Sequence, residues 1–300
     1  MLTIFFLVCY NRGVNTGGIF MSTLIDRERF EKERFDIILL IGQSNAEGFG
    51  QGEVANPYNP SPSILQLTNT APVFLEITPK DVPILHVEDP SSYKIEIAAE
   101  TVHPQQGTLG CFALPFAKSY CEKYLSGTER KVLVIRAAVG SSGFLRGNWC
   151  LNEPLYERAV EMTELALSLN PENRLAAVLW HQGESDVIVG RRKGGYDFTY
   201  PYYMEKFAAL TDDLRNRFGE CPFIAGAMCR EWTATIQEAS DAVEKATKET
   251  IEKTSLAAFA ESEGLRSNDF TVHNDDSIHF SRPALYELGQ RYFELYEKLR

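Results

Sequence analysis

Residues 36–48 read DIILLIGQSNAEG, and this stretch decides the fold. Its first half, residues 37–41, is an unbroken run of isoleucine and leucine. Such a run is typical of a strand that is buried on both faces of a parallel sheet. Its second half places a glycine and small polar residues directly after that strand. We therefore expect a strand followed by a tight turn, the first unit of an alternating β/α fold.

The same pattern recurs further along the chain. Apolar runs predict strands at residues 131–139, 175–180 and 223–228, and helical patterns cover residues 111–125, 153–169, 202–217, 235–253 and 283–299. Pro283 suits the first turn of the last helix. Strands that alternate with helices indicate parallel βαβ units, so we predict a three-layer α/β/α sandwich with a mainly parallel, flavodoxin-like central sheet.

One region interrupts this alternation. Residues 51–109 contain many of the prolines and several turn signals, with a candidate strand at residues 63–68. We interpret the region as a long surface excursion from a single domain that spans residues 35–300. Residues 1–34 are expected to form an N-terminal extension outside that fold.

The beginning of the chain allows three interpretations. Residues 2–10 are apolar but far shorter than the roughly 20 residues of a membrane-spanning helix, so no stable membrane insertion is expected. A weak signal peptide, a short membrane tether and an extension upstream of a start at Met21 all remain open, and we favour the extension. A cytoplasmic location is slightly favoured, and secretion applies if residues 1–20 act as a signal peptide.

Composition excludes several classes of function. Hydrophobic residues make up 44% of the chain, enough for a large core. The net charge of −11 argues against general nucleic-acid binding, which needs clustered positive charge. The 6 cysteines form no CxxC pair and the chain has only 5 histidines, so we expect neither a zinc ribbon nor a multi-histidine metal site.

Ser44 is the first candidate for chemistry. It follows the predicted strand at residues 37–41, and ligands gather beyond the carboxyl ends of the strands in open parallel sheets. A serine hydroxyl becomes an effective nucleophile when an adjacent base takes its proton. Taken alone, Ser44 is explained more simply as the N-cap of a helix.

His279 is the candidate base. It follows Asp276 by three residues, and residues three apart share one face of a helical or 3₁₀ turn. The Asp276 carboxylate would then orient the imidazole and leave its second nitrogen for Ser44. A surface ion pair is the alternative explanation of the Asp-x-x-His spacing, and His181 is the rival base.

Attack on a carbonyl also needs hydrogen-bond donors for the oxyanion that forms. Gly140 in AVGSSG offers a backbone N–H without a side chain in the way, and Gln182 in WHQGESD offers a side-chain amide. As single residues they are equally well a turn glycine and a polar loop residue. Residues 191–200 begin with basic residues and continue with aromatic ones. They form either a polar loop that leads into the next helix or a lid whose rings stack on a sugar.

Taken together, these motifs resemble a known family. GQSNA at 42–46, AVGSSGF at 138–144, WHQGESD at 180–186 and DDSIH at 275–279 follow one another in the order found in SGNH/GDSL-type serine hydrolases. The similarity is to the carbohydrate esterases among them, which include acetylxylan esterases and sialate O-acetylesterases. It spans about residues 36–282 and implies the SGNH hydrolase fold.

The resemblance also implies roles for individual residues. Ser44 would be the nucleophile, His279 the general base and acid, and Asp276 the residue that orients His279. The Ser44 N–H, the Gly140 N–H and the Gln182 side chain would form the oxyanion hole. Glu184 would support His279 from behind, although an acid at a helix N-terminus or a salt bridge explains it equally well.

We therefore predict a serine esterase that removes acetyl or other small acyl groups from a carbohydrate or a small ester. No cofactor and no nucleic-acid partner are expected. Two alternatives remain: a non-catalytic carbohydrate-binding relative on the same fold, and metal-assisted hydrolysis by His181 and Glu184. The second lacks a third ligand and the spacing of known zinc motifs.

Overall fold

A seven-stranded sheet forms the centre of the molecule, in the order β5-β2-β6-β1-β7-β8-β9. The structure is a computed structural model that describes residues 25–70, 73–77, 83–86, 92–100 and 109–300. Neighbouring strands run parallel except β2 and β5, which pair antiparallel. The strands of this sheet are β1 (Arg34–Gly42), β2 (Ile64–Asn69), β5 (Tyr93–Ile97), β6 (Arg130–Arg136), β7 (Arg174–His181), β8 (Phe223–Gly226) and β9 (Ala257–Ala260).

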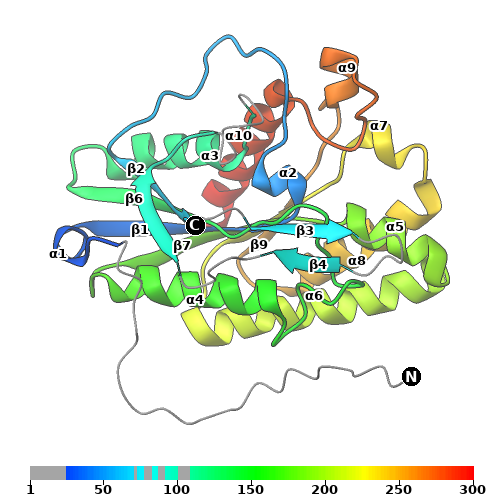
Figure 1. Ribbon diagram of the computed structural model, residues 1–300, viewed down its shortest axis with the longest axis horizontal. Coiled ribbons are helices and arrows are strands. Elements are labelled where there is room, and N and C mark those ends of the chain that lie inside the picture. Colours follow the sequence, from blue (N-terminus) through cyan, green and yellow to red (C-terminus); the bar gives the residue numbers. More distant parts are fainter. Residues whose placement is uncertain (1–24, 71–72, 78–82, 87–91, 101–108) are drawn as a thin grey trace, which may run out of the picture.

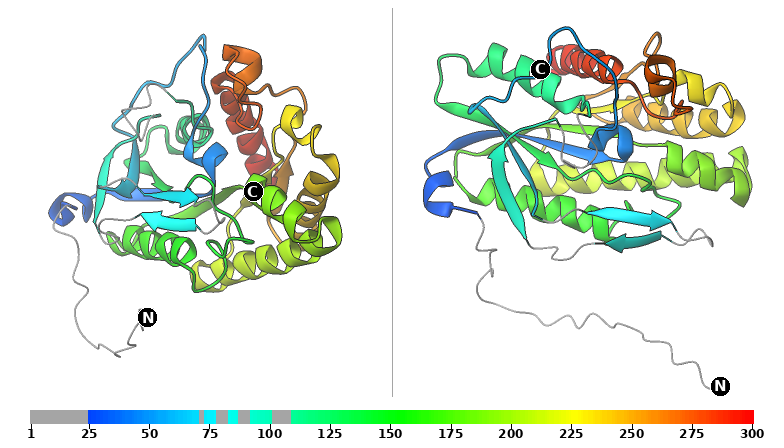
Figure 2. Two further views of the ribbon diagram at one scale, coloured as in Figure 1. Left: turned by 45° about the vertical axis from the view of Figure 1, so that its right-hand side comes forward. Right: turned by 45° about the horizontal axis from the view of Figure 1, so that its top comes forward.

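Helices cover both faces of the sheet (Figures 1 and 2). The long helices α4, α6 and α8 lie on one face, and α3 and α10 lie on the other (Figure 1). The predicted three-layer α/β/α architecture is thereby confirmed. The helices are α1 (Arg27–Phe30), α2 (Ser44–Glu47), α3 (Ala113–Tyr120), α4 (Pro154–Ser168), α5 (Glu184–Lys193), α6 (Tyr196–Phe218), α7 (Arg230–Thr233), α8 (Gln237–Lys253), α9 (Asn268–Val272) and α10 (Arg282–Leu299), and the π-helix η2 (Cys121–Leu125) continues α3.

Strand β1 shows why its sequence is an unbroken apolar run. Successive side chains of a strand point to opposite faces. Ile37, Leu39 and Ile41 therefore join the core under α4, α6 and α8, whereas Ile38 and Leu40 join the core under α3 and α10. Both sets are fully buried, so β1 is the central strand on which the two hydrophobic cores meet.

Residues 51–109 contribute more to the sheet than the sequence indicated. The predicted strand at residues 63–68 is observed as β2, but it pairs parallel with β6 inside the main sheet. β5 then pairs antiparallel with β2 and forms the sheet edge, and β3 (Phe74–Ile77) and β4 (Pro83–His86) form a separate hairpin. The interpretation of this region as a surface excursion was therefore wrong for β2 and β5.

The fold also begins earlier than predicted. Ile25 and Phe30 are buried in the core under α4 and α6, and β1 already starts at Arg34. Within the predicted extension, residues 25–34 therefore belong to the fold, because α1 packs an apolar side chain against it. Residues 1–24 lie outside the described part. No helix among the described residues is long and apolar enough to cross a membrane.

The prediction of a loop or lid at residues 191–200 was wrong, because these residues belong to two helices. Gly194 and Gly195 have φ values of +139° and +68°, a conformation that glycine adopts readily, and they separate α5 from α6. The ring of Tyr196 stacks on Tyr200 one helical turn later, with centroids 5.7 Å apart. Strand β9 was missed altogether, because its sequence AAFA is short and carries no clear strand pattern.

A buried carboxylate ties the amino ends of three strands together. Asp36 of β1 accepts hydrogen bonds from Arg130 of β6, from Arg174 of β7 and from the Tyr120 hydroxyl. Burial opposes ionisation of Asp36, but the hydrogen bonds from Arg174, Tyr120 and Arg130 outweigh it, so its pKa lies below the ordinary value.

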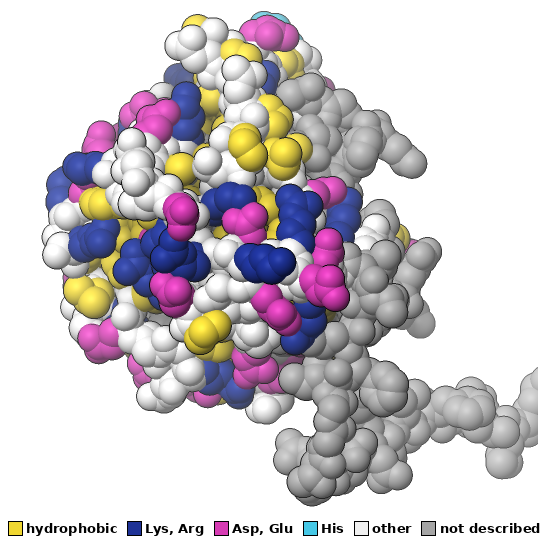
Figure 3. All heavy atoms as spheres, turned by 90° about the vertical axis from the view of Figure 1, so that its left-hand side faces the viewer, with side chains coloured by type: hydrophobic (Ala, Val, Ile, Leu, Met, Phe, Trp, Pro, Cys, Tyr) yellow, Lys and Arg dark blue, Asp and Glu magenta, His cyan; other side chains and the backbone are white. Residues whose placement is uncertain are grey.

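On the surface of the molecule that carries α1, basic and acidic side chains are interspersed (Figure 3).

We expect the substitution Asp36→Asn to lower the free energy of unfolding by about 3 kcal/mol, because it leaves two guanidinium groups without their buried anion. Since the folded pKa of Asp36 is depressed, the stabilisation is present above the unfolded value of about 3.9 and is lost as the pH falls through the folded value. Urea unfolding at several pH values measures this loss. The exposed Asp241→Asn is the matched control, and a pH-independent difference would contradict the assignment.

Candidate functional site

The carboxyl ends of β1 and β7 approach each other closely just before Ser44. Gly42 has a φ of +131°, and a Cβ atom at this position would lie 2.1 Å from the His181 carbonyl oxygen. The next residue, Gln43, donates its backbone N–H to the same oxygen at 3.0 Å. Only glycine fits here, so the chain turns sharply and α2 begins directly with Ser44.

Ser44, His279 and Asp276 form a continuous hydrogen-bonded chain. The Nε2 atom of His279 lies 2.8 Å from the Ser44 hydroxyl oxygen. The Nδ1 atom of His279 lies 2.9 Å from each carboxylate oxygen of Asp276. This arrangement allows the imidazole to take the serine proton while the carboxylate stabilises the resulting imidazolium.

The surroundings of Asp276 keep it ionised. Burial opposes ionisation, but the hydrogen bonds from His279 and Asn268 outweigh it, so the pKa of Asp276 lies below its ordinary value. Asn268 donates to the second carboxylate oxygen at 2.9 Å. The ring of Phe49 stacks on the imidazole of His279, with centroids 5.3 Å apart, and so fixes its plane.

Asn45 connects α2 to the loop that carries His279. Its side-chain amide donates to Glu184 at 2.7 Å and to the Ile278 carbonyl at 3.2 Å, and its oxygen accepts the Phe280 N–H at 3.0 Å. Asn45 is fully buried. It thereby sets the position of the loop that contains His279 relative to Ser44.

Glu184 lies behind this connection, at the start of α5. It is fully buried, and burial raises the pKa of its carboxyl while the hydrogen bond from Asn45 lowers it in part. Its second oxygen has no hydrogen-bond partner among the described residues. The structure therefore links Glu184 to the His279 loop through Asn45.

Gly140 lies beside Ser44, but its N–H is already used. It donates to a carboxylate oxygen of Glu47 at 2.7 Å. A Cβ atom at Gly140 would lie 3.2 Å from that oxygen and 3.6 Å from the Ser44 Cβ atom. Ser44 and the Glu47 carboxylate are thus both close to Gly140.

Gln182 is likewise engaged within the protein. Its amide nitrogen lies 2.6 Å from Asp186, 3.1 Å from the Gln43 side-chain oxygen and 3.1 Å from the Ser142 carbonyl. An amide nitrogen has two hydrogens, so it cannot satisfy these acceptors all at once. Asp186 also accepts the backbone N–H groups of Phe144 and Leu145, which anchors the loop after Gly140.

Asp186 was not recognised from the sequence, although it ends the QGESD motif. Burial raises its pKa to about 6, against the hydrogen bonds from Leu145, Gln182 and Phe144. Glu47, Asn45 and Asn268 were missed as well. Their side chains act through contacts that join distant parts of the chain, which no local pattern reveals.

His181, the rival base, lies in the core instead. It is fully buried, its Nδ1 atom lies 3.1 Å from the Tyr292 hydroxyl, and burial lowers its pKa to about 3. Among the described residues, no group of three or more histidine, cysteine, aspartate or glutamate side chains is placed to hold a metal ion.

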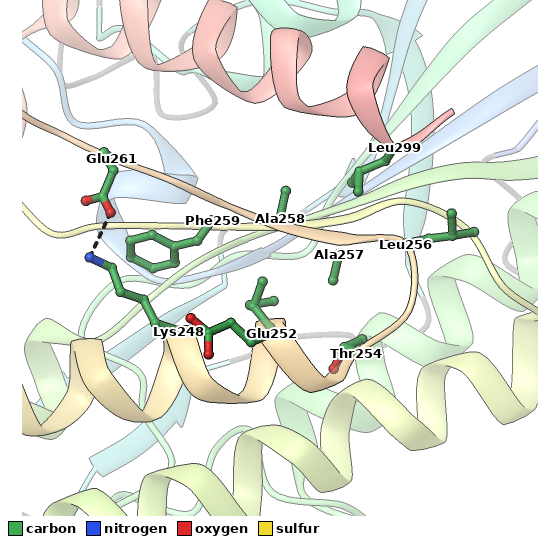
Figure 4. A pocket seen from close by; sticks show the side chains of 10 residues that line it. Lys248, Glu252, Thr254, Leu256, Ala257, Ala258, Phe259, Glu261 and Leu299 are labelled. Carbon is green, nitrogen blue, oxygen red and sulfur yellow. Dashed lines mark ion pairs between the residues drawn. The ribbon is translucent and has the colours of Figure 1, made fainter.

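Two hollows differ in their relation to Ser44. One of about 360 Å³ lies along β9, where Lys248 pairs with Glu261 at 2.7 Å, and it shares no residue with the Ser44 cluster (Figure 4). The other, of about 850 Å³, is linked to Asp276 through two hydrogen bonds, because the backbone N–H of its residue Gln51 donates to Asn268, which donates to Asp276. This second hollow is lined by Gln51, Gly52, Glu53, Leu109, Thr271, Val272 and Arg282.

Comparison with known proteins gives a consistent result. A model of the family described as carbohydrate esterase, sialic acid-specific acetylesterase, matches residues 34–298. An Escherichia coli K12 protein named "Probable 9-O-acetyl-N-acetylneuraminic acid deacetylase" is 24% identical over 239 residues, which cover 69% of this chain and 71% of that protein.

Solved structures agree on the fold. The chain aligns with NanS at a TM-score of 0.63 and 20% identity, covering 89% of this chain and 97% of that one. It aligns with a protein of Parabacteroides merdae described as a GDSL-like lipase at a TM-score of 0.50 and 11% identity, covering 89% and 98%. The predicted SGNH hydrolase fold is thereby confirmed.

We expect Asn45→Ala to lower the free energy of unfolding by about 2–4 kcal/mol, because it removes the side-chain donor to the buried Glu184 carboxyl. The hydrogen bond from Asn45 lowers the pKa of Glu184, so its removal raises that pKa further and the loss of stability should grow as the pH rises. Urea unfolding at several pH values measures it.

The double variant Asn45→Ala/Glu184→Leu is the matched control. It removes the carboxylate as well as its donor, so it should recover part of the lost stability. Strictly additive losses would contradict the proposed link between Asn45 and Glu184.

Proposed function

The chain belongs to the carbohydrate esterase family of sialic acid-specific acetylesterases, and we propose that it hydrolyses O-acetyl esters of sialic acid through a Ser44-His279-Asp276 triad. The chain is thus a carboxylic ester hydrolase that acts on an acetylated carbohydrate. The observation that carries the proposal of the triad is the hydrogen bond of 2.8 Å between His279 Nε2 and the Ser44 hydroxyl. This hydrogen bond supports an acyl-enzyme route.

In the first step, the Ser44 oxygen attacks the acetyl carbon while His279 takes the hydroxyl proton. A tetrahedral intermediate forms, and its negative oxygen is held by N–H donors. Ser44 opens α2, so its own N–H has no acceptor within the helix and is suited to this role. The sugar alcohol then leaves with the proton from His279, and Ser44 remains acetylated.

In the second step, water replaces the sugar. His279 takes a proton from the water, the resulting hydroxide attacks the acetyl carbon, and the bond to Ser44 breaks. The proton returns to the Ser44 oxygen, and acetate is the product. Asp276 remains ionised throughout and stabilises the imidazolium, consistent with its lowered pKa.

Two observations support sialic acid as the sugar of the substrate. The matching family model is described as sialic acid-specific, and the Escherichia coli relative is named for the 9-O-acetyl form. The hollow of about 850 Å³ that Gln51 lines is large enough for one sugar residue.

We expect Ser44→Ala to lower the kcat for p-nitrophenyl acetate by about 10⁴-fold or more, because no nucleophile remains for His279 to activate. Release of p-nitrophenolate measures the rate. Ser168→Ala, on the exposed side of α4, is the matched control. Equal rates in the wild type and Ser44→Ala would overturn the triad, and failure of a fluorophosphonate probe to label Ser44 would favour the non-catalytic, carbohydrate-binding alternative.

Acetate release distinguishes the sugars. We expect faster release, in kcat/KM, from 9-O-acetyl-N-acetylneuraminic acid than from an acetylated xylo-oligosaccharide, since only the former fits the family's description. An enzyme-coupled acetate assay measures both. A preference for the xylan fragment would refute the substrate but leave the triad intact.

A further inference from the structure

A third hollow, of about 290 Å³, lies where the end of α5 meets the beginnings of α6 and α8. It shares no residue with the Ser44 cluster or with the hollow that Gln51 lines. Its volume is at the lower end of the range for small-molecule sites and suits a single sugar residue. The residues that line it include Arg191, Gly195, Tyr196, Ile236, Gln237 and Glu238.

Tyr196 gives this hollow an aromatic ring that is already held in place. The ring stacks on Tyr200, with centroids 5.7 Å and planes 10° apart. The Tyr200 hydroxyl in turn donates to Glu249 of α8 at 2.7 Å, which fixes the stack between two helices. Because Tyr200 covers one face of the Tyr196 ring, a ligand in the hollow meets the other face or the edge. Packing on an ordered ring costs a ligand little side-chain entropy.

Arg191, Gln237 and Glu238 supply polar groups around this ring. Arg191 is exposed near the end of α5, and Glu238 is exposed in the first turn of α8. Within the described part of the chain, neither of these two side chains forms an ion pair, with each other or with a third residue. The guanidinium and the amide nitrogen can therefore donate to a ligand, and the carboxylate and the amide oxygen can accept from it.

Gly195 keeps the space between these groups open. Its φ of +68° lets the chain pass directly from α5 to α6, and its N–H donates to the Gly190 carbonyl oxygen at 2.9 Å. A Cβ atom at Gly195 would meet no heavy atom within 4 Å. The turn thus places no side chain between Arg191 and Tyr196.

This set of groups favours a neutral sugar over other ligands. The C–H face of a pyranose packs on an aromatic ring, and its hydroxyl groups both donate and accept hydrogen bonds. One sugar can therefore satisfy a guanidinium and a carboxylate at the same time. Phosphate would be repelled by Glu238, and a metal cation would be repelled by Arg191.

We propose that this hollow is a carbohydrate site apart from Ser44, which binds one neutral pyranose on the Tyr196 ring through hydrogen bonds to Arg191 and Glu238. Residues 191–200 then contribute a separate binding surface and no lid. Arg191 follows Glu184 by seven residues in α5, so it lies about 10 Å further along that helix. A glycan of a few sugar units spans this distance. Binding at the hollow involves no covalent step and does not depend on ester hydrolysis.

Two isoleucines report separately on the hollow and on the triad. Ile236 lines the hollow, and Ile278 directly precedes His279. The full chain, labelled with ¹³C at the isoleucine δ1-methyl groups, is titrated with methyl β-galactopyranoside, and the methyl signals are followed by two-dimensional NMR. The variants Ile236→Val and Ile278→Val identify the two signals.

We expect the Ile236 signal to shift with the sugar until it saturates, at a concentration that is independent of any change at Ile278. Tyr196→Ala should weaken this binding about ten-fold, because the stacking surface is lost. Arg191→Ala should weaken it about three-fold, because one donor is lost.

Phe198→Ala is the matched control. Phe198 stacks on Tyr202 of the same helix, with centroids 5.8 Å apart, and 38% of its surface is exposed, but it does not line the hollow. Its removal also takes one exposed ring from α6, so it should leave the affinity for the sugar within about two-fold of the wild type.

The proposal fails if the Ile236 signal does not shift with the sugar, or if Tyr196→Ala and Phe198→Ala change the affinity equally. Inorganic phosphate is titrated in the same way, and a shift with phosphate but not with the sugar would also overturn it. Melting temperatures show whether the variants are folded, and the exposed Arg191→Ala decides the question if Tyr196→Ala does not fold. Since no readout uses catalysis, the outcome does not depend on the role of Ser44.

Discussion

The side-chain amide of Asn45 is the connection on which the rest of the site depends. Ser44 stands at the end of β1, and His279 arrives from a loop more than 230 residues later, so nothing local holds them at hydrogen-bond distance. Asn45 uses both ends of its amide on that loop, at Ile278 and Phe280, and also binds Glu184. Because Asn45 directly follows the nucleophile, any shift of the loop strains a bond next to Ser44.

Four buried carboxylates show how differently this fold accommodates negative charge. Asp36 is neutralised by two arginines at the far end of the sheet, and its pKa is lowered. Glu184 and Asp186 lack such cations and are held by amide and backbone donors, so burial prevails and their pKa values are raised. Glu47 accepts the Gly140 N–H. Asp36 lies near the amino end of β1, whereas the other three follow the carboxyl ends of β1 and β7.

The sequence predicts the central strands better than it predicts the edges of the fold, and it names the three residues that the structure joins by hydrogen bonds at Ser44. The central strand β1 is readable because its isoleucines and leucines face two cores at once. Ser44 can be predicted because it directly follows a strand, and Asp276 and His279 can be predicted because they lie three residues apart on one turn. Strand β9 is not readable, because its four small residues carry no alternation and are placed by their neighbour β8.

Residues 191–200 and the donors near Ser44 mark the limit of such reasoning. Basic and aromatic residues after a motif look like a loop, but two adjacent glycines allow one helix to end and the next to begin at once. In the same way, Gly140 and Gln182 are recognisable as donors, whereas their present acceptors are not. Glu47 and Asp186 lie 93 and 4 residues away from them in the chain, and only the folded arrangement brings them to those N–H groups.

Hydrogen-bond donors that stabilise a transient negative charge must meet two opposing requirements when no substrate is bound. A buried N–H without an acceptor is costly, yet a donor that is bound too firmly cannot serve the transition state. Internal carboxylates and carbonyls resolve the conflict, since they keep Gly140 and Gln182 oriented and bonded at rest. The Gln182 nitrogen has more acceptors within reach than hydrogens to give, so it can exchange one partner without losing all.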